Sequence, residues 1–138
     1  MIFAHTIDLL LSGRKTQTLR LAYHGDFLSA EWDGHSGFTQ TWAVRRADRT
    51  VRWMTGHTYA IQRERCHKAE GRFRCTYLRE VLDPLTVDAD FARAEGFDSV
   101  DEYLAVWHKL HGKNPRQRCW AIGMELVTVQ VAESGREE

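Results

Sequence analysis

Two long strand-like segments, with helical segments between them, constrain the fold more than any other feature of this sequence. The segment GRFRCTYLREVL, residues 71–82, places Phe73, Cys75 and Tyr77 on one face and polar side chains on the other. That alternation is typical of a β-strand. The segment RCWAIGMELVTVQV, residues 118–131, is predicted to be the last strand. No repeated strand–helix–strand unit connects them, which argues against a parallel sheet.

Shorter elements are predicted before the first of these segments. Residues 1–4 are apolar and read as an edge strand, and a helix capped by Thr6 is expected to end at Gly13. The segments TQTLRL (16–21) and HTYAIQ (57–62) read as strands. TWAVRR (41–46) and TVRWM (50–54) read as a hairpin.

Two helices are predicted before the last strand. Thr86 is expected to cap the first, which ends near Gly96. Ser99 and Glu102 form a capping box for the second, which ends at Gly112. The fold class is therefore α+β, a mainly antiparallel β-barrel flanked by about three helices. Residues 1–130 are predicted to form a single domain with an elaborated insertion at 22–56, and residues 131–138 a frayed tail.

The composition describes a globular domain. The chain has 138 residues, of which 43% are hydrophobic and 28% charged. No apolar run approaches the roughly 18 residues that a membrane helix needs. No signal peptide is visible, and three cysteines without a CxxC pair argue against a disulfide framework. The sequence therefore predicts a cytoplasmic protein with no membrane partner.

Charge is distributed unevenly, although the formal net charge is zero. Residues 40–79 hold ten Lys or Arg against three Asp or Glu, and residues 80–106 hold eight acids against one base. Aromatic residues are interleaved with the basic stretch, which favours a nucleic acid or nucleotide partner. Alternatively, the acidic helices fold against the basic strands and cancel their field.

The segment SGRKTQTLR, residues 12–20, is the most specific motif. A helix ending in GRKTQTLR, the strand GHTYAIQ, AEGF before SVDEYLAVWHKLHG, and a closing strand with CWAIGMEL together resemble the ASCH domain. The hallmark of that family is a Gly-x-Lys-x-x-x-x-Arg signature, here Gly13, Lys15 and Arg20. The resemblance runs from Ile2 to about Val127, apart from residues 22–56, and implies a PUA-like β-barrel.

The resemblance implies a protein that binds RNA or a nucleoside in a cleft beside the barrel. One branch of the family hydrolyses the acetyl amide of 4-acetylcytidine, and another member is described as a ribonuclease. The catalytic set of the amidohydrolase branch is a lysine, a threonine three residues later and a more distant glutamate. Lys15 and Thr18 match the first two positions, and Glu95 matches the third by its place before the second of the two late helices.

Elementary chemistry agrees with this set. A threonine hydroxyl becomes a nucleophile when a base removes its proton, and a lysine does so when burial lowers its pKa. Lys15 and Thr18 would point to opposite faces of a continuous strand, so the turn after Gly13 must persist to about Lys15 or Thr16. Substrate-binding side chains are predicted at Arg14, Thr16, Arg20, Arg63 and Arg65. Alternatively, Arg63 and Arg65 pair with Glu64, Glu70 or the acidic helices.

Other residues have simpler explanations. His108 and His111 have the spacing of a metal pair, but no third ligand is evident, so neither a metal nor a cofactor is predicted. Trp107 has the spacing of a core residue. Trp32, Trp42 and Trp53 of the insertion form a second small core or stack on a base. No obligate protein partner is evident. Three functions stay open: a 4-acetylcytidine amidohydrolase, a non-catalytic RNA- or nucleotide-binding module, and a ribonuclease drawing on His57 or His67.

Overall fold

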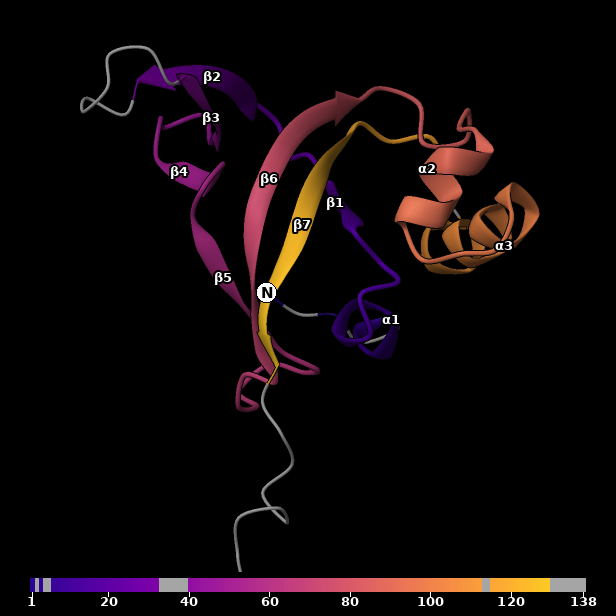
Figure 1. The fold of residues 1–138 in the computed structure, drawn as a ribbon. Coiled ribbons are helices and arrows are strands. Elements are labelled where there is room, and N and C mark those ends of the chain that lie inside the picture. Colours follow the sequence, from indigo (N-terminus) through magenta and orange to yellow (C-terminus); the bar gives the residue numbers. More distant parts are fainter. Residues whose placement is uncertain (2, 4–5, 33–39, 113–114, 130–138) are drawn as a thin grey trace, which may run out of the picture.

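The computed structural model describes residues 1, 3, 6–32, 40–112 and 115–129. Two antiparallel sheets and three helices make up this described part of the chain (Figure 1). The first sheet has the strand order β1 (Gln17–Leu21), β7 (Cys119–Val129), β6 (Gly71–Val81) and β5 (Thr58–Ile61). The second has the order β2 (Phe27–Trp32), β3 (Gln40–Arg45) and β4 (Val51–Met54). The α+β class is confirmed.

The paired strands β6 and β7 are the centre of the molecule, as their sequences predict. Side chains of β6 alternate between buried and exposed, with Phe73 and Cys75 inside. At the middle of β7, Gly123 pairs with Gln17 of β1 on one side and Tyr77 of β6 on the other. A Cβ at Gly123 would lie 2.2 Å from two Tyr77 ring carbons. The glycine is therefore required by the ring that crosses it.

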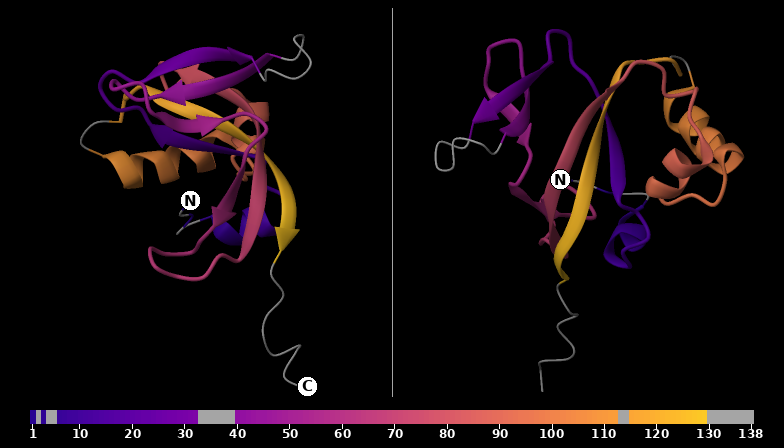
Figure 2. Two further views of the ribbon diagram at one scale, coloured as in Figure 1. Left: turned by 90° about the vertical axis from the view of Figure 1, so that its left-hand side faces the viewer. Right: turned by 45° about the horizontal axis from the view of Figure 1, so that its top comes forward.

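Three helices lie on one side of the curved first sheet, and β2–β4 lie on the other (Figures 1 and 2). They are α1 (Ile7–Leu11), α2 (Ala89–Ala94) and α3 (Val100–His111). As predicted, the Ser99 side chain caps α3, accepting from Glu102 N at 3.1 Å.

One predicted helix cap is wrong, and another holds its position without the expected side-chain hydrogen bond. Asp88 caps α2, because its carboxylate accepts a hydrogen bond from Phe91 N at 2.8 Å. Thr86 instead donates its hydroxyl to Asp83. Thr6 precedes α1 without a side-chain cap hydrogen bond.

The interval 22–56 contains the whole second sheet. Its β3–β4 hairpin is predicted from the sequence, whereas β2 is not. The side chains of Val44 and Trp53 join those of Phe73 and Trp120 in the core between the sheets. The predicted tail, residues 131–138, lies outside the described residues.

The N-terminal residues pair with the end of β5. Phe3 N donates to Gln62 O at 2.8 Å, and Gln62 N donates to Met1 O at 2.9 Å. This is the backbone pairing of the predicted edge strand, of which residues 2 and 4 lie outside the described part. Among the described residues, no helix has the length and hydropathy needed to span a membrane.

Candidate functional site

A pocket of about 160 Å³ lies between β1, the end of α2 and one side of α3. Its walls combine four polar side chains that the sequence predicts for the site with aromatic side chains of α3. A cavity of about this size holds a single aromatic ring. The lining residues include Lys15, Thr18, Arg20, Glu95, Phe97, Tyr103, Trp107 and His111.

Lys15 and Glu95 form a buried ion pair in this pocket. Each residue is only 4% exposed. Lys15 Nζ lies 3.4 Å from Glu95 Oε1, and it also donates to the backbone oxygen of Glu95 at 3.0 Å. Because the two residues are 80 positions apart, the pair joins the turn after α1 to the end of α2.

The turn after α1 brings Lys15 and Thr18 to the same pocket. Gly13 has a φ of 82°, which a glycine adopts without strain. Lys15 N then donates to Leu9 O at 3.0 Å, so the turn persists to Lys15 and the strand begins only at Gln17. The turn therefore extends as far as the sequence requires if Lys15 and Thr18 are to reach the same pocket.

The end of α2 closes the free edge of β1. Thr16 N donates to Ala94 O at 2.8 Å, and the backbone N–H of Leu19 donates to the Glu95 carboxylate. Glu95 occupies the C-cap position of α2, where its backbone is still helical. The helix end therefore presents a carboxylate to β1 in place of another strand.

Burial moves the pKa values of this pair toward one another. Desolvation lowers the pKa of Lys15 from its ordinary value, against the attraction of Glu95, and the positive charge of Arg20 lowers it further. Desolvation raises the pKa of Glu95, against the attraction of Lys15 and the hydrogen bond from Gln17. Both groups are thus pushed toward their neutral forms, the amine and the carboxylic acid.

Gln17 belongs to the site although the sequence does not indicate it. Its Nε2 donates to Glu95 Oε2 at 2.8 Å, and its Oε1 accepts from the Tyr77 hydroxyl at 2.6 Å. The side chains of Tyr77, Gln17, Glu95 and Lys15 therefore form one hydrogen-bonded chain. This chain fixes the orientation of the carboxylate.

Aromatic side chains of α3 form the apolar wall of the pocket. Trp107 stacks on Tyr103 at 6.3 Å between ring centroids, and its Nε1 donates to Pro115 O at 2.6 Å. The His111 ring lies 4.1 Å from the Trp107 ring, and burial lowers its pKa. Trp107 is buried, as its helical spacing predicts, and it also faces the pocket.

Four of the predicted binding residues lie outside the pocket lining. Arg14 is exposed and pairs with Asp98, and Thr16 is exposed. Arg63 pairs with Glu70 and Asp8. The remaining binding residue, Arg65, is exposed on the segment between β5 and β6. The two histidines considered for a ribonuclease are also exposed, His67 on the same segment and His57 just before β5. Of the five predicted binding residues, only Arg20 reaches the pocket.

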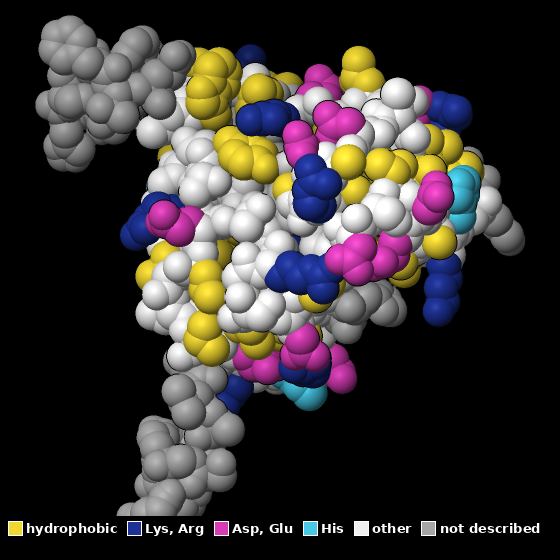
Figure 3. Space-filling model, turned by 45° about the vertical axis from the view of Figure 1, so that its right-hand side comes forward, with side chains coloured by type: hydrophobic (Ala, Val, Ile, Leu, Met, Phe, Trp, Pro, Cys, Tyr) yellow, Lys and Arg dark blue, Asp and Glu magenta, His cyan; other side chains and the backbone are white. Residues whose placement is uncertain are grey.

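The arginines of the basic stretch form ion pairs mainly with acids that lie outside the acidic helices. Arg45 pairs with Glu31, Arg52 with Asp26, and Arg74 with Glu125. Figure 3 shows basic and acidic side chains next to one another on one face of the molecule. Within the described residues, no group of three His, Cys, Asp or Glu side chains is placed to hold a metal ion.

No family model matches the chain, and no curated protein matches its sequence. Solved structures that are similar to it include the following two. The ASCH domain from Lactobacillus crispatus JV V101 has 16% identity and a TM-score of 0.60, over 89% of this chain and 70% of that one. A protein from Enterococcus faecalis V583, described by the family model DUF984, has 18% identity and a TM-score of 0.52, over 91% and 72%. The chain therefore has the fold of the ASCH domain.

Proposed function

We propose that the protein binds a cytidine in this pocket and hydrolyses the acetyl amide of 4-acetylcytidine. The observation that carries the proposal is the convergence of an amine, a hydroxyl and a carboxyl group on one buried pocket. Lys15, Thr18 and Glu95 supply these groups. The pocket has the volume of a ring-sized ligand, and Tyr103 and Trp107 offer aromatic walls to a base.

The proposed reaction has two steps. Thr18 Oγ1 attacks the acetyl carbonyl carbon while the neutral Lys15 amine takes the hydroxyl proton. The carbon–nitrogen bond then breaks, the leaving nitrogen takes a proton, and an acetyl ester remains on Thr18. Water hydrolyses the ester, which releases acetate and restores the hydroxyl. Glu95 supplies the proton to the leaving nitrogen and takes a proton from the attacking water in the second step, while Lys15 returns its proton to the Thr18 oxygen.

The buried pair holds the single proton that this cycle needs. An ion pair and a neutral amine–acid pair contain the same number of protons, and desolvation reduces the preference for the charged arrangement. Attack requires the neutral amine, and departure of the nitrogen requires an acid. One proton shared by Lys15 and Glu95 satisfies both requirements.

The dependence of kcat/KM on pH is expected to be bell-shaped. At low pH the pair gains a second proton, which removes the base, and the raised pKa of Glu95 places this limb above 4.5. At high pH the pair loses its proton, which removes the acid, and the lowered pKa of Lys15 places this limb below 10.5. Initial rates between pH 4 and 11 test this. A rate that rises continuously to pH 11 contradicts the shared proton.

The test of the function is hydrolysis of 4-acetylcytidine by the purified protein, followed by chromatography of cytidine and acetate. Turnover is expected for the wild type and is expected to be lost in Thr18→Val, which keeps the shape of the side chain. Thr128→Val, at an exposed position of β7, is the matched control and should be fully active. Absence of wild-type turnover, with cytidine still bound, would show a binding module instead.

We place this activity in the cytoplasm. All three cysteines are free, and Cys75 and Cys119 are buried. Unpaired thiols agree with a reducing compartment.

A further inference from the structure

A second cavity, of about 420 Å³, adjoins the pocket. The two cavities share Leu19, Arg20, Trp107 and His111 in their walls. The other walls of the second cavity, here called the groove, come largely from the interval 22–56 and its flanks. These residues are Met1, Leu21, Tyr23, Arg52 and Trp53. A ligand that fills the pocket can therefore continue past Arg20 into the groove.

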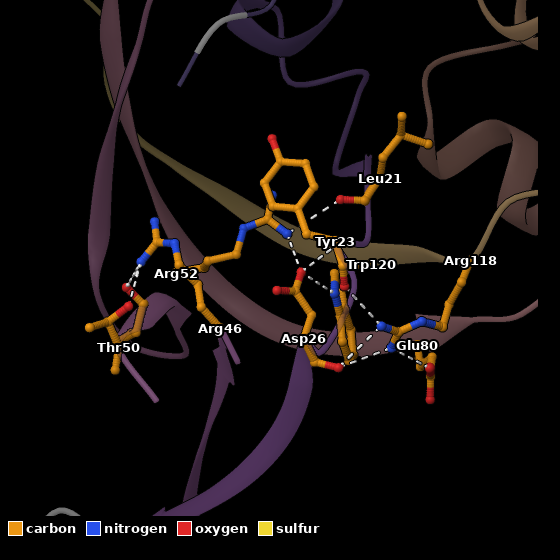
Figure 4. Close-up of polar contacts among 10 residues, drawn as sticks. Leu21, Tyr23, Asp26, Arg46, Thr50, Arg52, Glu80, Arg118 and Trp120 are labelled. Carbon is orange, nitrogen blue, oxygen red and sulfur yellow. Dashed lines mark hydrogen bonds and ion pairs between the residues drawn. The ribbon is translucent and has the colours of Figure 1, made fainter. Parts of the chain in front are cut away.

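Arg52 lies between two aromatic rings in the groove. Its guanidinium carbon is 4.2 Å from the centroid of the Tyr23 ring and 4.0 Å from that of the Trp53 ring. The same guanidinium pairs with the Asp26 carboxylate and donates to Leu21 O at 3.3 Å (Figure 4). The position of the arginine is thus fixed before any ligand arrives, which favours binding.

The loop that carries Tyr23 is held in place from the other side. Arg118 donates to the backbone oxygens of Tyr23 and Asp26, at 3.2 and 3.1 Å from its Nη2, and its Nη1 pairs with Glu80 (Figure 4). Tyr23 N and Trp120 Nε1 both donate to Asp26 Oδ2. Tyr23 is nevertheless 61% exposed. A rigidly held aromatic side chain with this much exposure offers a stacking surface for a base.

The groove also brings two like charges together. Arg20 and Arg52 both line it. Desolvation lowers the pKa of Arg20 to about 10, and the charge of Arg52 contributes to the shift while Glu95 opposes it. An anion bound in the groove near both guanidinium groups would reduce their mutual repulsion. Arginine is well suited to phosphate because its planar fork matches two phosphate oxygens.

We propose that the groove is a second subsite, which binds the phosphodiester and the neighbouring base of an RNA strand whose target base occupies the pocket. The inference rests on the proposed function, because it takes the pocket to be the base site. Arg20 and Arg52 contact the phosphate, and the neighbouring base stacks on Tyr23. The preferred substrate is therefore 4-acetylcytidine within an RNA strand, and the free nucleoside, which fills the pocket alone, is a weaker substrate.

The first experiment measures binding of two probes, cytidine and the trinucleotide UCU, to the wild-type protein by calorimetry. The trinucleotide is expected to bind at least about tenfold more tightly, since the groove adds the stacking of one base. Tyr23→Ala is expected to lose about tenfold in affinity for the trinucleotide and nothing for cytidine. Tyr23→Phe keeps the ring and should bind both probes as the wild type does.

The phosphate contact is tested with Arg52→Lys. The lysine keeps a charge beside Asp26, so the fold is retained, but it loses the planar fork and the stacking between the rings. We expect about tenfold weaker binding of the trinucleotide, while the dependence of that binding on salt is kept because the charge remains. Arg74→Gln, which removes an exposed arginine of β6 outside the groove, is the matched control and should change neither.

Equal affinity of the wild type for both probes would overturn the subsite. Equal losses for cytidine and the trinucleotide in Tyr23→Ala would overturn it too, because the residue would then act on the pocket. The two proposals fail separately. A protein that prefers the trinucleotide through Tyr23 but does not hydrolyse 4-acetylcytidine retains the subsite and loses the reaction.

Discussion

Replacing Lys15 with methionine is expected to lower the free energy of unfolding by about 3–5 kcal/mol, the usual cost of removing one partner from a buried ion pair. Methionine fills similar space but leaves the Glu95 carboxylate without its cation in a site that is almost closed to water. Hydrolysis of 4-acetylcytidine should be abolished at the same time, because the proposed base is gone. Urea unfolding followed by tryptophan fluorescence measures the stability.

Two further variants identify the cause of that loss. The double variant Lys15→Met/Glu95→Gln also replaces the Glu95 carboxylate by a neutral amide. Most of the stability should therefore return, while activity stays absent. Lys109→Met removes an exposed lysine of α3 and should change the free energy of unfolding by less than about 0.5 kcal/mol. If the double variant is no more stable than Lys15→Met, the loss does not come from the unpaired carboxylate.

Gly123→Ala is expected to lower the free energy of unfolding by about 1–3 kcal/mol, the usual cost of overpacking. The added Cβ would lie 2.2 Å from the Tyr77 ring and 2.5 Å from Thr76 Oγ1. The ring must move, and its hydroxyl then leaves Gln17, which orients the Glu95 carboxylate. We therefore also expect kcat for 4-acetylcytidine to fall about tenfold. Thermal unfolding and initial rates measure the two effects.

The Tyr77 ring supplies the control. Tyr77→Phe removes only the hydroxyl, so it should reproduce the loss of activity with a smaller loss of stability, about 1 kcal/mol. Gly123→Ala/Tyr77→Ala removes the clash and should be less destabilised than the sum of the two single variants. Additive losses would mean that the clash with the ring is not the cause.

The parts of the fold that the sequence predicts are those with a buried face. In β6 and β7, alternation or a long apolar run follows from packing against the core. Strand β2 has no such signal, because Phe27, Leu28 and Ala30 are all exposed. The predicted cap of α2 is wrong because Thr86 and Asp88 are both good caps, and only the contact of Thr86 with Asp83 decides between them.

Predicting the candidate site from the sequence alone has a similar limit. The signature places Lys15 and Thr18 near one another, but their common direction depends on a backbone bond from Lys15 to Leu9. Glu95 is predicted as a catalytic residue only through the family resemblance, since nothing in the local sequence distinguishes it from other acids near a helix end. Gln17 was missed because a strand residue beside Thr18 is expected to face away from it. For Arg63 the sequence leaves both a place at the cleft and an ion pair with Glu70 open, and the fold decides for the ion pair.

The pairing of β1 with β7 also determines when the site can exist during synthesis. In the first sheet β1 has β7 as its strand partner, and Thr18 lies opposite Ile122, about a hundred residues later in the chain. Closing so long a loop is slow and comes late in folding. A ribosome-bound chain that ends before Cys119 holds Lys15 and Glu95 but lacks the strand that positions them. Ligand binding would therefore report completion of the fold, because a nascent chain that lacks β7 has no assembled pocket.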